Sequence, residues 1–121
     1  MIKLFLIEQL FCFMIDKKER LLEMRITELL DINSIDLNPQ VSNKEEAINH
    51  LVDLLDQSGK LNDKEIYKES VLNREAQSTT GIGDGVAIPH GQSEGVKTAG
   101  LSAMVVKEGL DFKSLDGQPT Y

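Results

Sequence analysis

The chain has 121 residues, with 20 Asp and Glu against 13 Lys and Arg, a formal net charge of −7 and an isoelectric point near 4.8. This length suits one domain with a single hydrophobic core. Its acidic balance and the lack of a concentrated basic patch argue against nucleic acid as a partner. The single cysteine, Cys12, cannot form an intrachain disulfide, which agrees with a reducing cytoplasm.

Residues 1–15 are almost continuously apolar, and the charged stretch 16–20 follows them. A membrane span needs about 20 apolar residues, and a secretory signal needs a small-residue cleavage site, which is missing after this run. We therefore expect residues 1–23 to be an N-terminal extension, either a helix seeking an apolar surface or the product of a mis-assigned start. The domain proper is then predicted over 24–121. A buried first helix is the alternative.

A capping-box pattern at 42–45 predicts a helix from about 43 to 57, which Gly59 ends. His50 lies off the apolar stripe of this helix, so we interpret it as a solvated histidine and not as a second catalytic group. The predicted inner face consists of Ile48, Leu51, Val52 and Leu55.

A second helix is predicted from residue 62 to about 74 or 75 by the same logic. Strands are predicted at 86–89 and 99–106, and within 26–37, where the pattern is ambiguous and ends before Pro39. The predicted inner face of the second helix consists of Ile66, Val71 and Leu72. Strands interleaved with helices predict an α/β fold in which helices flank a mixed β-sheet.

One histidine stands in an unusual setting, between Pro89 and Gly91 and directly after a glycine-rich loop. Pro89 fixes its own φ and pushes Ile88 into an extended conformation, while Gly91 permits a sharp turn. We expect His90 to be held at a strand end, where an imidazole can act as nucleophile, proton shuttle or ligand. A histidine that merely caps a strand is the alternative, because turn chemistry alone explains the proline and glycine.

The residues before His90 could surround a phosphate. Arg74 offers a fork of donors, Thr79 and Thr80 offer hydroxyls, and the glycine-rich loop offers unobstructed backbone N–H groups. Each has an ordinary explanation alone, since an arginine at a helix C-terminus complements the macrodipole and threonines form turns. Their co-occurrence favours a site for phosphoryl transfer, which requires positioning and positive or hydrogen-bonding groups. Asp84 would repel a phosphate, so we interpret it as a turn residue or a partner-facing group.

Two other site types fail on spacing. A dinucleotide fingerprint starting at Gly81 requires glycine or alanine at position 86, where the chain has Val86, and no helix follows. A metal site requires clustered ligands, whereas the two histidines are far apart in sequence and Cys12 is alone. We therefore expect neither a nucleotide nor a metal cofactor.

The stretch 73–120 resembles the type-2 (fructose and mannitol class) enzyme IIA domain of the bacterial phosphoenolpyruvate-dependent sugar phosphotransferase system. The motifs that carry the resemblance are Arg74-Glu75, the Ser-Thr-Thr-Gly-Ile-Gly loop at 78–83, Ala-Ile-Pro-His-Gly at 87–91, Gly-Leu-Asp-Phe at 109–112 and Leu-Asp-Gly-Gln-Pro at 115–119. Together they span nearly half of the chain, which makes the set far more specific than any single short pattern.

The resemblance implies a phosphocarrier whose histidine, here His90, accepts a phosphoryl group from HPr on Nε2 and passes it to a cysteine of enzyme IIB. The membrane enzyme IIC is then an indirect partner. Arg74 matches the arginine of the family near the phosphorylated site. The phosphate pocket is expected to be shaped by Thr79, Thr80, Gly81, Gly83 and Gly91.

The resemblance also implies an apparent truncation at the C-terminus, because the domain of the family continues beyond the position of Tyr121. Missing strands would leave a sheet edge unpaired, so self-association is an expected consequence. Two alternatives to sugar transport stay open. One is a nitrogen-related regulatory type-2 protein that acts by binding partners, and the other is an inactive truncated remnant.

Overall fold

A computed structural model describes residues 3–7 and 29–121 of the chain. Within these residues it confirms the mixed α/β fold, with a four-stranded sheet of order β2-β6-β1-β5, a two-stranded hairpin of β3 and β4, and the two helices α4 and α5. The elements are β1 (Lys3–Ile7), β2 (Leu30–Asp36), α4 (Lys44–Gln57), α5 (Lys64–Gln77), β3 (Gly81–Gly83), β4 (Val86–Ala87), β5 (His90–Gly91) and β6 (Leu101–Met104).

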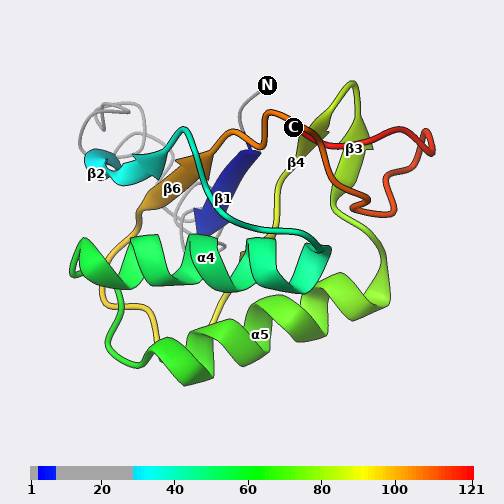
Figure 1. Ribbon diagram of the computed structural model, residues 1–121. Helices are drawn as coiled ribbons and strands as arrows, with labels where there is room; N and C mark the ends of the chain where they lie inside the picture. Colours follow the sequence, from blue (N-terminus) through cyan, green and yellow to red (C-terminus); the bar gives the residue numbers. More distant parts are fainter. Residues whose placement is uncertain (1–2, 8–28) are drawn as a thin grey trace, which may run out of the picture.

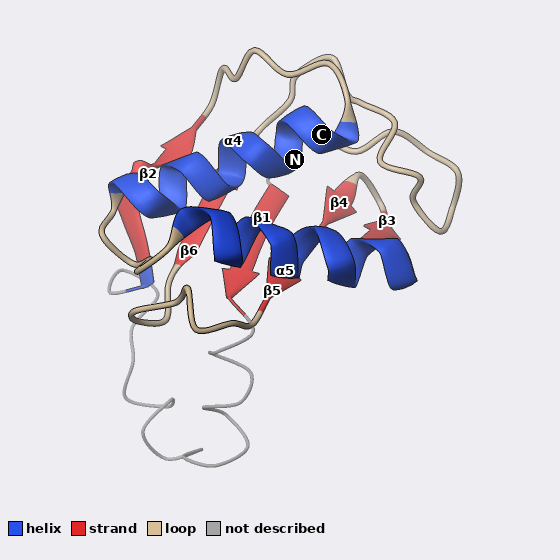
Figure 2. Ribbon diagram, turned by 90° about the horizontal axis from the view of Figure 1, so that it is seen from below, coloured by secondary structure: helices blue, strands red, loops and turns tan. Residues whose placement is uncertain are grey.

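The sheet is mixed, and both helices lie on one of its faces. Strand β6 runs antiparallel to β1 and parallel to β2, whereas β1 runs parallel to β5. Figure 1 shows α4 and α5 side by side beneath the sheet, and the view from below in Figure 2 places both helices in front of the strands. The hairpin of β3 and β4 stands at one end of this arrangement, on the side where α5 ends.

The N-terminal segment differs from the helix that the sequence suggests. Residues Lys3–Ile7 form the strand β1, while the rest of the predicted extension 1–23 lies outside the described residues. A short, continuously apolar run is compatible with either a helix or a strand covered on both faces, so periodicity cannot separate the two. The helix prediction is therefore wrong for Lys3–Ile7, and the domain boundary between residues 23 and 24 stays a prediction.

The helix predicted over 43–57 is confirmed as α4, but its N-cap residue lies one position later than the capping-box pattern indicates. Asn43 is the N-cap, and its Oδ1 accepts a hydrogen bond from the Glu46 backbone N–H at 2.9 Å. The Glu46 carboxylate reaches back and accepts from the Ser42 backbone N–H and hydroxyl, each at 2.8 Å. Asparagine and serine cap helices about equally well, so local preference alone could not choose between positions 42 and 43.

The second helix, α5, extends two residues beyond its predicted end, and Asp63 caps its start. The prediction that Ile66 faces inward is wrong, because its exposed fraction is 47%. The helix instead buries Tyr67 and Val71, which are one turn apart on a single face, together with Glu75. A tyrosine one position later in the sequence thus takes the place that the apolar pattern assigned to Ile66.

The core lies between the two helices and the sheet. Two buried serines of the sheet also bind α4, since the Ser102 hydroxyl donates to the Leu51 carbonyl at 2.8 Å and the Ser34 hydroxyl donates to the Leu54 carbonyl at 3.4 Å. Among the described residues, no helix is long and apolar enough to cross a membrane. The core residues are Ala47, Ile48, Leu51, Val52, Leu55, Leu61, Tyr67, Val71, Ala87, Val96, Met104, Val106, Leu110 and Phe112.

The three predicted strands form, but each is shorter than its apolar pattern. The run 86–89 is divided, with β4 ending at Ala87 and β5 starting at His90, because Pro89 cannot donate to a ladder. Strand β6 covers only Leu101–Met104 of the predicted 99–106. Strand β2 lies at the edge of the sheet, which leaves the Ile32 side chain 81% exposed.

Packing in this core predicts the cost of truncating a side chain. Leu51→Ala removes a fully buried side chain, and we expect the free energy of unfolding to fall by about 2 to 5 kcal/mol. Ile32→Ala, at the exposed edge-strand position, should change it by less than about 0.5 kcal/mol. Urea titration of both variants measures the two effects, and equal destabilisation would contradict the burial pattern.

Candidate functional site

The hairpin before the histidine is a tight turn held by a second loop. Asp84 and Gly85 both have positive φ, at 55° and 77°. The Asp84 backbone N–H donates to the Asp116 carboxylate at 3.0 Å, and a side chain is tolerated at this φ chiefly for aspartate or asparagine. The interpretation of Asp84 as a turn residue is therefore confirmed.

Beyond the hairpin, the chain is tied back to the loop that precedes it. The Ile88 backbone N–H donates to the Thr80 carbonyl at 3.0 Å, which continues the pairing of Gly81 with Ala87. This bond fixes Ile88 two residues before His90. The Pro-His-Gly segment therefore leaves a braced hairpin rather than a free loop.

His90 is half-buried, and its ring is oriented by its own backbone segment. Nδ1 lies 3.0 Å from the Ile88 carbonyl oxygen. Because a carbonyl oxygen can only accept, this contact requires a proton on Nδ1. In the neutral imidazole the lone pair then lies on Nε2, which makes Nε2 the nucleophilic nitrogen.

Gly91 allows α5 to approach this segment closely. A Cβ at Gly91 would lie 2.5 Å from the Ser70 hydroxyl oxygen and 3.0 Å from the Val71 backbone nitrogen. Such distances to a backbone atom cannot be relieved by a side-chain rotation, so the helix packs here only because the residue is glycine. The Pro-His-Gly segment thus rests directly on the surface of α5.

Arg74 stands one helical turn after Ser70, on the same side of α5. Its Nη1 donates to the Ser78 carbonyl at 3.0 Å and to the Ser78 hydroxyl at 3.3 Å, where the chain leaves the helix. The structure therefore brings the arginine to the end of the helix that supports Gly91. Its remaining N–H groups give it capacity for further acceptors.

A buried carboxylate anchors the other side of the loop. Glu75 accepts from the Thr80 backbone N–H and from the Thr80 hydroxyl, each at 2.7 Å. Lys44 of α4 completes the group, with its Nζ 2.8 Å from Glu75 Oε1 and 4.6 Å from the centre of the buried Phe112 ring. The hydroxyl of Thr80 is thus a donor within the protein.

The remaining predicted pocket residues contact the segment 113–118 and its neighbours. The Thr79 hydroxyl donates to the Phe112 carbonyl at 3.2 Å and accepts from the Gly81 N–H at 3.1 Å. A Cβ at Gly81 would lie 2.8 Å from the Ser114 Cα, and one at Gly83 would lie 3.0 Å from Asp116 Oδ2. These residues shape the loop through contacts inside the protein.

Two opposing effects act on the Glu75 carboxyl. Burial alone would raise its pKa, but the Lys44 ammonium and the two Thr80 donors stabilise the ionised form and hold the pKa below its ordinary value. The ionised carboxylate is therefore the form that ties α4, α5 and the loop together.

His50 does not belong to this site, in agreement with the sequence, but it is not simply solvated. Its Nε2 lies 2.7 Å from Asp36 Oδ2 at the end of β2, and both side chains are about 30% exposed. The Asn38 backbone N–H and then His50 hold the pKa of Asp36 below its usual range. This pairing between a helix and an edge strand could not be read from the helical stripe alone.

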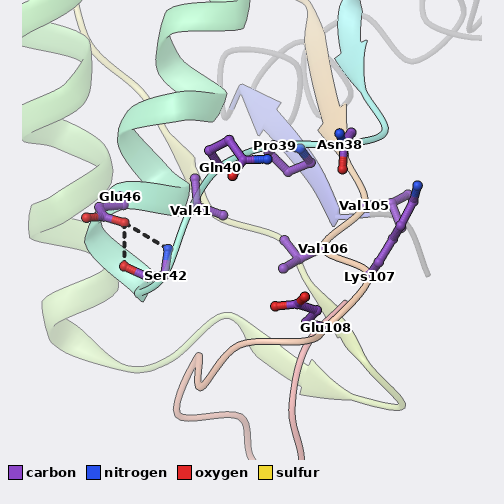
Figure 3. Close-up of a pocket in the computed structure, with 10 residues that line it drawn as sticks. All are labelled: Asn38, Pro39, Gln40, Val41, Ser42, Glu46, Val105, Val106, Lys107 and Glu108. Carbon is purple, nitrogen blue, oxygen red and sulfur yellow. Dashed lines mark hydrogen bonds between the residues drawn. The ribbon is translucent and has the colours of Figure 1, made fainter.

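A pocket of about 480 Å³ lies elsewhere, between the segment that leads into α4 and the segment that follows β6 (Figure 3). None of the predicted site residues lines it. Within residues 3–7 and 29–121, no group of three or more His, Cys, Asp or Glu side chains is arranged to hold a metal ion. The residues that line the pocket are Asn38, Pro39, Gln40, Val41, Ser42, Glu46, Val105, Val106, Lys107 and Glu108.

Residues 28–121 match the family model described as "Phosphoenolpyruvate-dependent sugar phosphotransferase system, EIIA 2". The chain belongs to this family. The match includes every predicted site residue and all of the structure except β1, which precedes it.

Curated relatives share this family. The chain is 49% identical over 98 residues to the PTS system fructose-specific EIIABC component of Bacillus subtilis (strain 168), covering 81% of the chain and 15% of that protein. It is 32% identical over 94 residues to the PTS system fructose-specific EIIA component of Haloferax volcanii, covering 78% of the chain and 61% of that protein.

A solved structure is similar as well. The nitrogen regulatory protein IIA-Ntr from Neisseria meningitidis superimposes with a TM-score of 0.66 at 32% identity, covering 78% of the chain and 64% of that protein. The chain therefore spans less than two thirds of the length of each of these three relatives.

Sequence reasoning missed the residues that support the site from behind. Glu75 was visible only as part of a motif, and nothing in the pattern showed that it is buried and binds Thr80. The sequence analysis did not single out Lys44 or Ser70. Their roles depend on which helix faces which loop, and that is a property of the tertiary fold.

The Glu75 network predicts a pH-dependent stability. Because folding lowers the pKa of this carboxyl, its contribution is fully present above the ordinary value of 4.5 and is lost as the pH falls through the lowered folded-state value. Glu75→Gln should therefore destabilise the protein at pH 7 by about 1 to 3 kcal/mol, with the difference from the parent shrinking below pH 4.5. Denaturant unfolding between pH 7 and 3.5 measures this, and Glu65→Gln on the exposed side of α5 is the control. A gap that stays constant across the range would refute the assignment.

Proposed function

We propose that the chain is a cytoplasmic phosphocarrier of a sugar phosphotransferase system, with His90 as both acceptor and donor of the phosphoryl group. HPr supplies the group, and a cysteine of enzyme IIB receives it for uptake of a fructose-type sugar through the membrane enzyme IIC. The observation that carries the proposal is the contact of His90 Nδ1 with the Ile88 carbonyl, which leaves Nε2 as the nucleophile. Membership in the EIIA family and the 49% identity to a fructose-specific component support it.

The chemistry balances without a cofactor. The lone pair of His90 Nε2 forms a bond to phosphorus while the bond between phosphorus and the donor group of HPr breaks. The proton stays on Nδ1 and is donated to the Ile88 carbonyl oxygen, and this hydrogen bond stabilises the positive charge that develops on the ring. In the second step a cysteine thiolate of enzyme IIB attacks phosphorus, and Nε2 leaves with its lone pair restored.

The neighbouring residues have supporting roles in this proposal. Arg74 provides a guanidinium fork for the equatorial phosphate oxygens, and the hydrogen bond from its Nη1 to the Ser78 carbonyl holds the guanidinium in place. Thr79, Thr80, Gly81, Gly83 and Gly91 shape the pocket, the threonines by anchoring the loop and Gly91 by admitting α5.

The similarity to IIA-Ntr of Neisseria meningitidis supports a second candidate function, regulation through phosphorylation-dependent binding of partners. The same His90 chemistry would serve both functions. Transfer onward to a fructose-type enzyme IIB distinguishes them, because a regulatory protein would accept the group from HPr but fail to pass it on at a useful rate.

The acceptor assignment predicts opposite behaviour for the two histidines. In a reconstituted mixture of phosphoenolpyruvate, enzyme I and HPr, His90→Ala should abolish acid-labile labelling of the chain. His50→Ala should leave labelling nearly intact, because His50 pairs with Asp36 rather than with the site loop.

Labelling that survives in His90→Ala would contradict the assignment, as would its loss in a folded His50→Ala chain. A parent chain that folds but takes up no label would favour the inactive remnant.

Arg74 should act on the rate rather than on the fold. We expect Arg74→Ala to slow phosphoryl uptake from HPr by about tenfold to a hundredfold, because it removes charge stabilisation from the transition state. Arg74→Lys should recover only part of the rate, since an ammonium lacks the planar fork. Lys68→Ala removes a charge from the same helix and serves as the control in rapid-quench kinetics. Parental kinetics in Arg74→Ala would mean that the arginine only complements the helix end.

A further inference from the structure

Strand β1 occupies an interior position in the sheet, beside the candidate acceptor. On one edge it pairs antiparallel with β6, with Leu6 opposite Leu101. On the other edge it pairs parallel with β5, with Leu6 opposite His90 and Ile7 opposite Gly91. Figures 1 and 2 show β1 next to β6, and in Figure 2 β5 lies on its other side.

This strand lies outside the part of the chain that matches the family, which starts at residue 28. Within the described residues, β1 is the element that joins β5 to β6 and β2 in one sheet. The strand beside the histidine is therefore supplied by a segment that family membership does not assign to the site.

The pairing matters because the strands on both sides of β1 are covered. All four residues of β6 are buried, and so is Gly91 of β5. Backbone N–H and C=O groups that face β1 would lose their partners without it, and an unpaired buried backbone group destabilises the fold. The sequence of β1 suits this place, since Leu4-Phe5-Leu6-Ile7 is an unbroken apolar run of the kind found in interior strands.

The acceptor segment is thus held from two directions. The turn of α5 at Ser70 and Val71 contacts Gly91 closely, while β1 pairs with the backbone of both His90 and Gly91. The contact with α5 fixes the distance between the segment and the helix. The pairing with β1 fixes the direction of the segment along the sheet. The direction of the His90 backbone in turn sets whether Nδ1 meets the Ile88 carbonyl.

We infer that Lys3–Ile7 is a positioning strand for the acceptor histidine, which holds His90 and Gly91 in register so that the Nδ1 contact to Ile88 forms and Nε2 is presented. The chemical part of this inference rests on the proposed phosphocarrier function, whereas the strand pairing does not. The N-terminal segment is then part of the site's support and not an extension that the domain could lose.

The test compares two substitutions at the residue opposite His90. Leu6→Pro removes a backbone donor from an interior strand, which the ladder cannot accommodate. Leu6→Ile keeps an apolar side chain at the same place, and its branched Cβ suits a strand, so it serves as the matched control. Both are made in the full chain.

Three readouts follow, two of which do not depend on phosphoryl transfer. Native-state amide hydrogen exchange should show protected β5 and β6 amides in the parent and in Leu6→Ile. In Leu6→Pro that protection should be lost, while α4 and α5 stay protected. The imidazole ¹⁵N shifts of His90 should report the Nδ1–H tautomer in the first two chains and a mixture in the third. Phosphoryl uptake from HPr should fall at least about tenfold in Leu6→Pro.

Protection, tautomer and rate that are the same in Leu6→Pro as in the parent would overturn the inference, and so would an absence of β5 and β6 protection in the parent. If Leu6→Pro loses protection throughout, an excess of a peptide spanning residues 1–9 is added. Recovery of protection supports the strand pairing, because a free strand can complete an open sheet, and no recovery overturns it. If the parent takes up no phosphoryl group, the proposed function fails, while exchange and ¹⁵N shifts still decide the role of β1.

Discussion

The ionised Glu75 carboxylate, buried between the two helices and the site loop, connects the scaffold to the candidate acceptor. It binds Lys44 from α4 and both donors of Thr80, and the Thr80 carbonyl in turn accepts from Ile88. The Ile88 carbonyl then accepts a hydrogen bond from the Nδ1–H of His90. A charge buried in this way is costly unless fully paired, so the helix packing and the loop conformation depend on each other.

This chain of contacts explains how a site on a loop can be rigid. The hairpin turn at Asp84 is held by Asp116, and Gly91 lets the Pro-His-Gly segment rest on α5 without an intervening side chain. A nucleophile for phosphoryl transfer needs its reactive atom in a fixed direction, because most of the catalysis is positioning and electrostatics. Here that direction is set by backbone groups, which leaves the imidazole itself half-buried and accessible.

Some parts of the structure were readable from local patterns and others were not. Both helices followed from capping residues and apolar spacing, and the strand predicted to end before Pro39 does end there, at Asp36. Ile66 was misplaced because Tyr67 fits the same stripe with a one-residue rotation. Whether residues 3–7 form a helix or a strand depended on an open position between β5 and β6, which no pattern within the segment could reveal.

The choice of His90 as candidate acceptor, the class of fold and the family resemblance came from short-range information, because turn glycines, capping residues and the Pro-His-Gly run encode their conformations locally. The tertiary structure decided which ring nitrogen of His90 is free, that Glu75 anchors Thr80, and that His50 pairs with Asp36. The second and third contacts join groups from different elements, and the first depends on the conformation of the segment 88–90, which the hairpin and α5 hold in place. Burial, charge pairing and sheet register are properties of the packed chain, and a single sequence specifies them only through the fold as a whole.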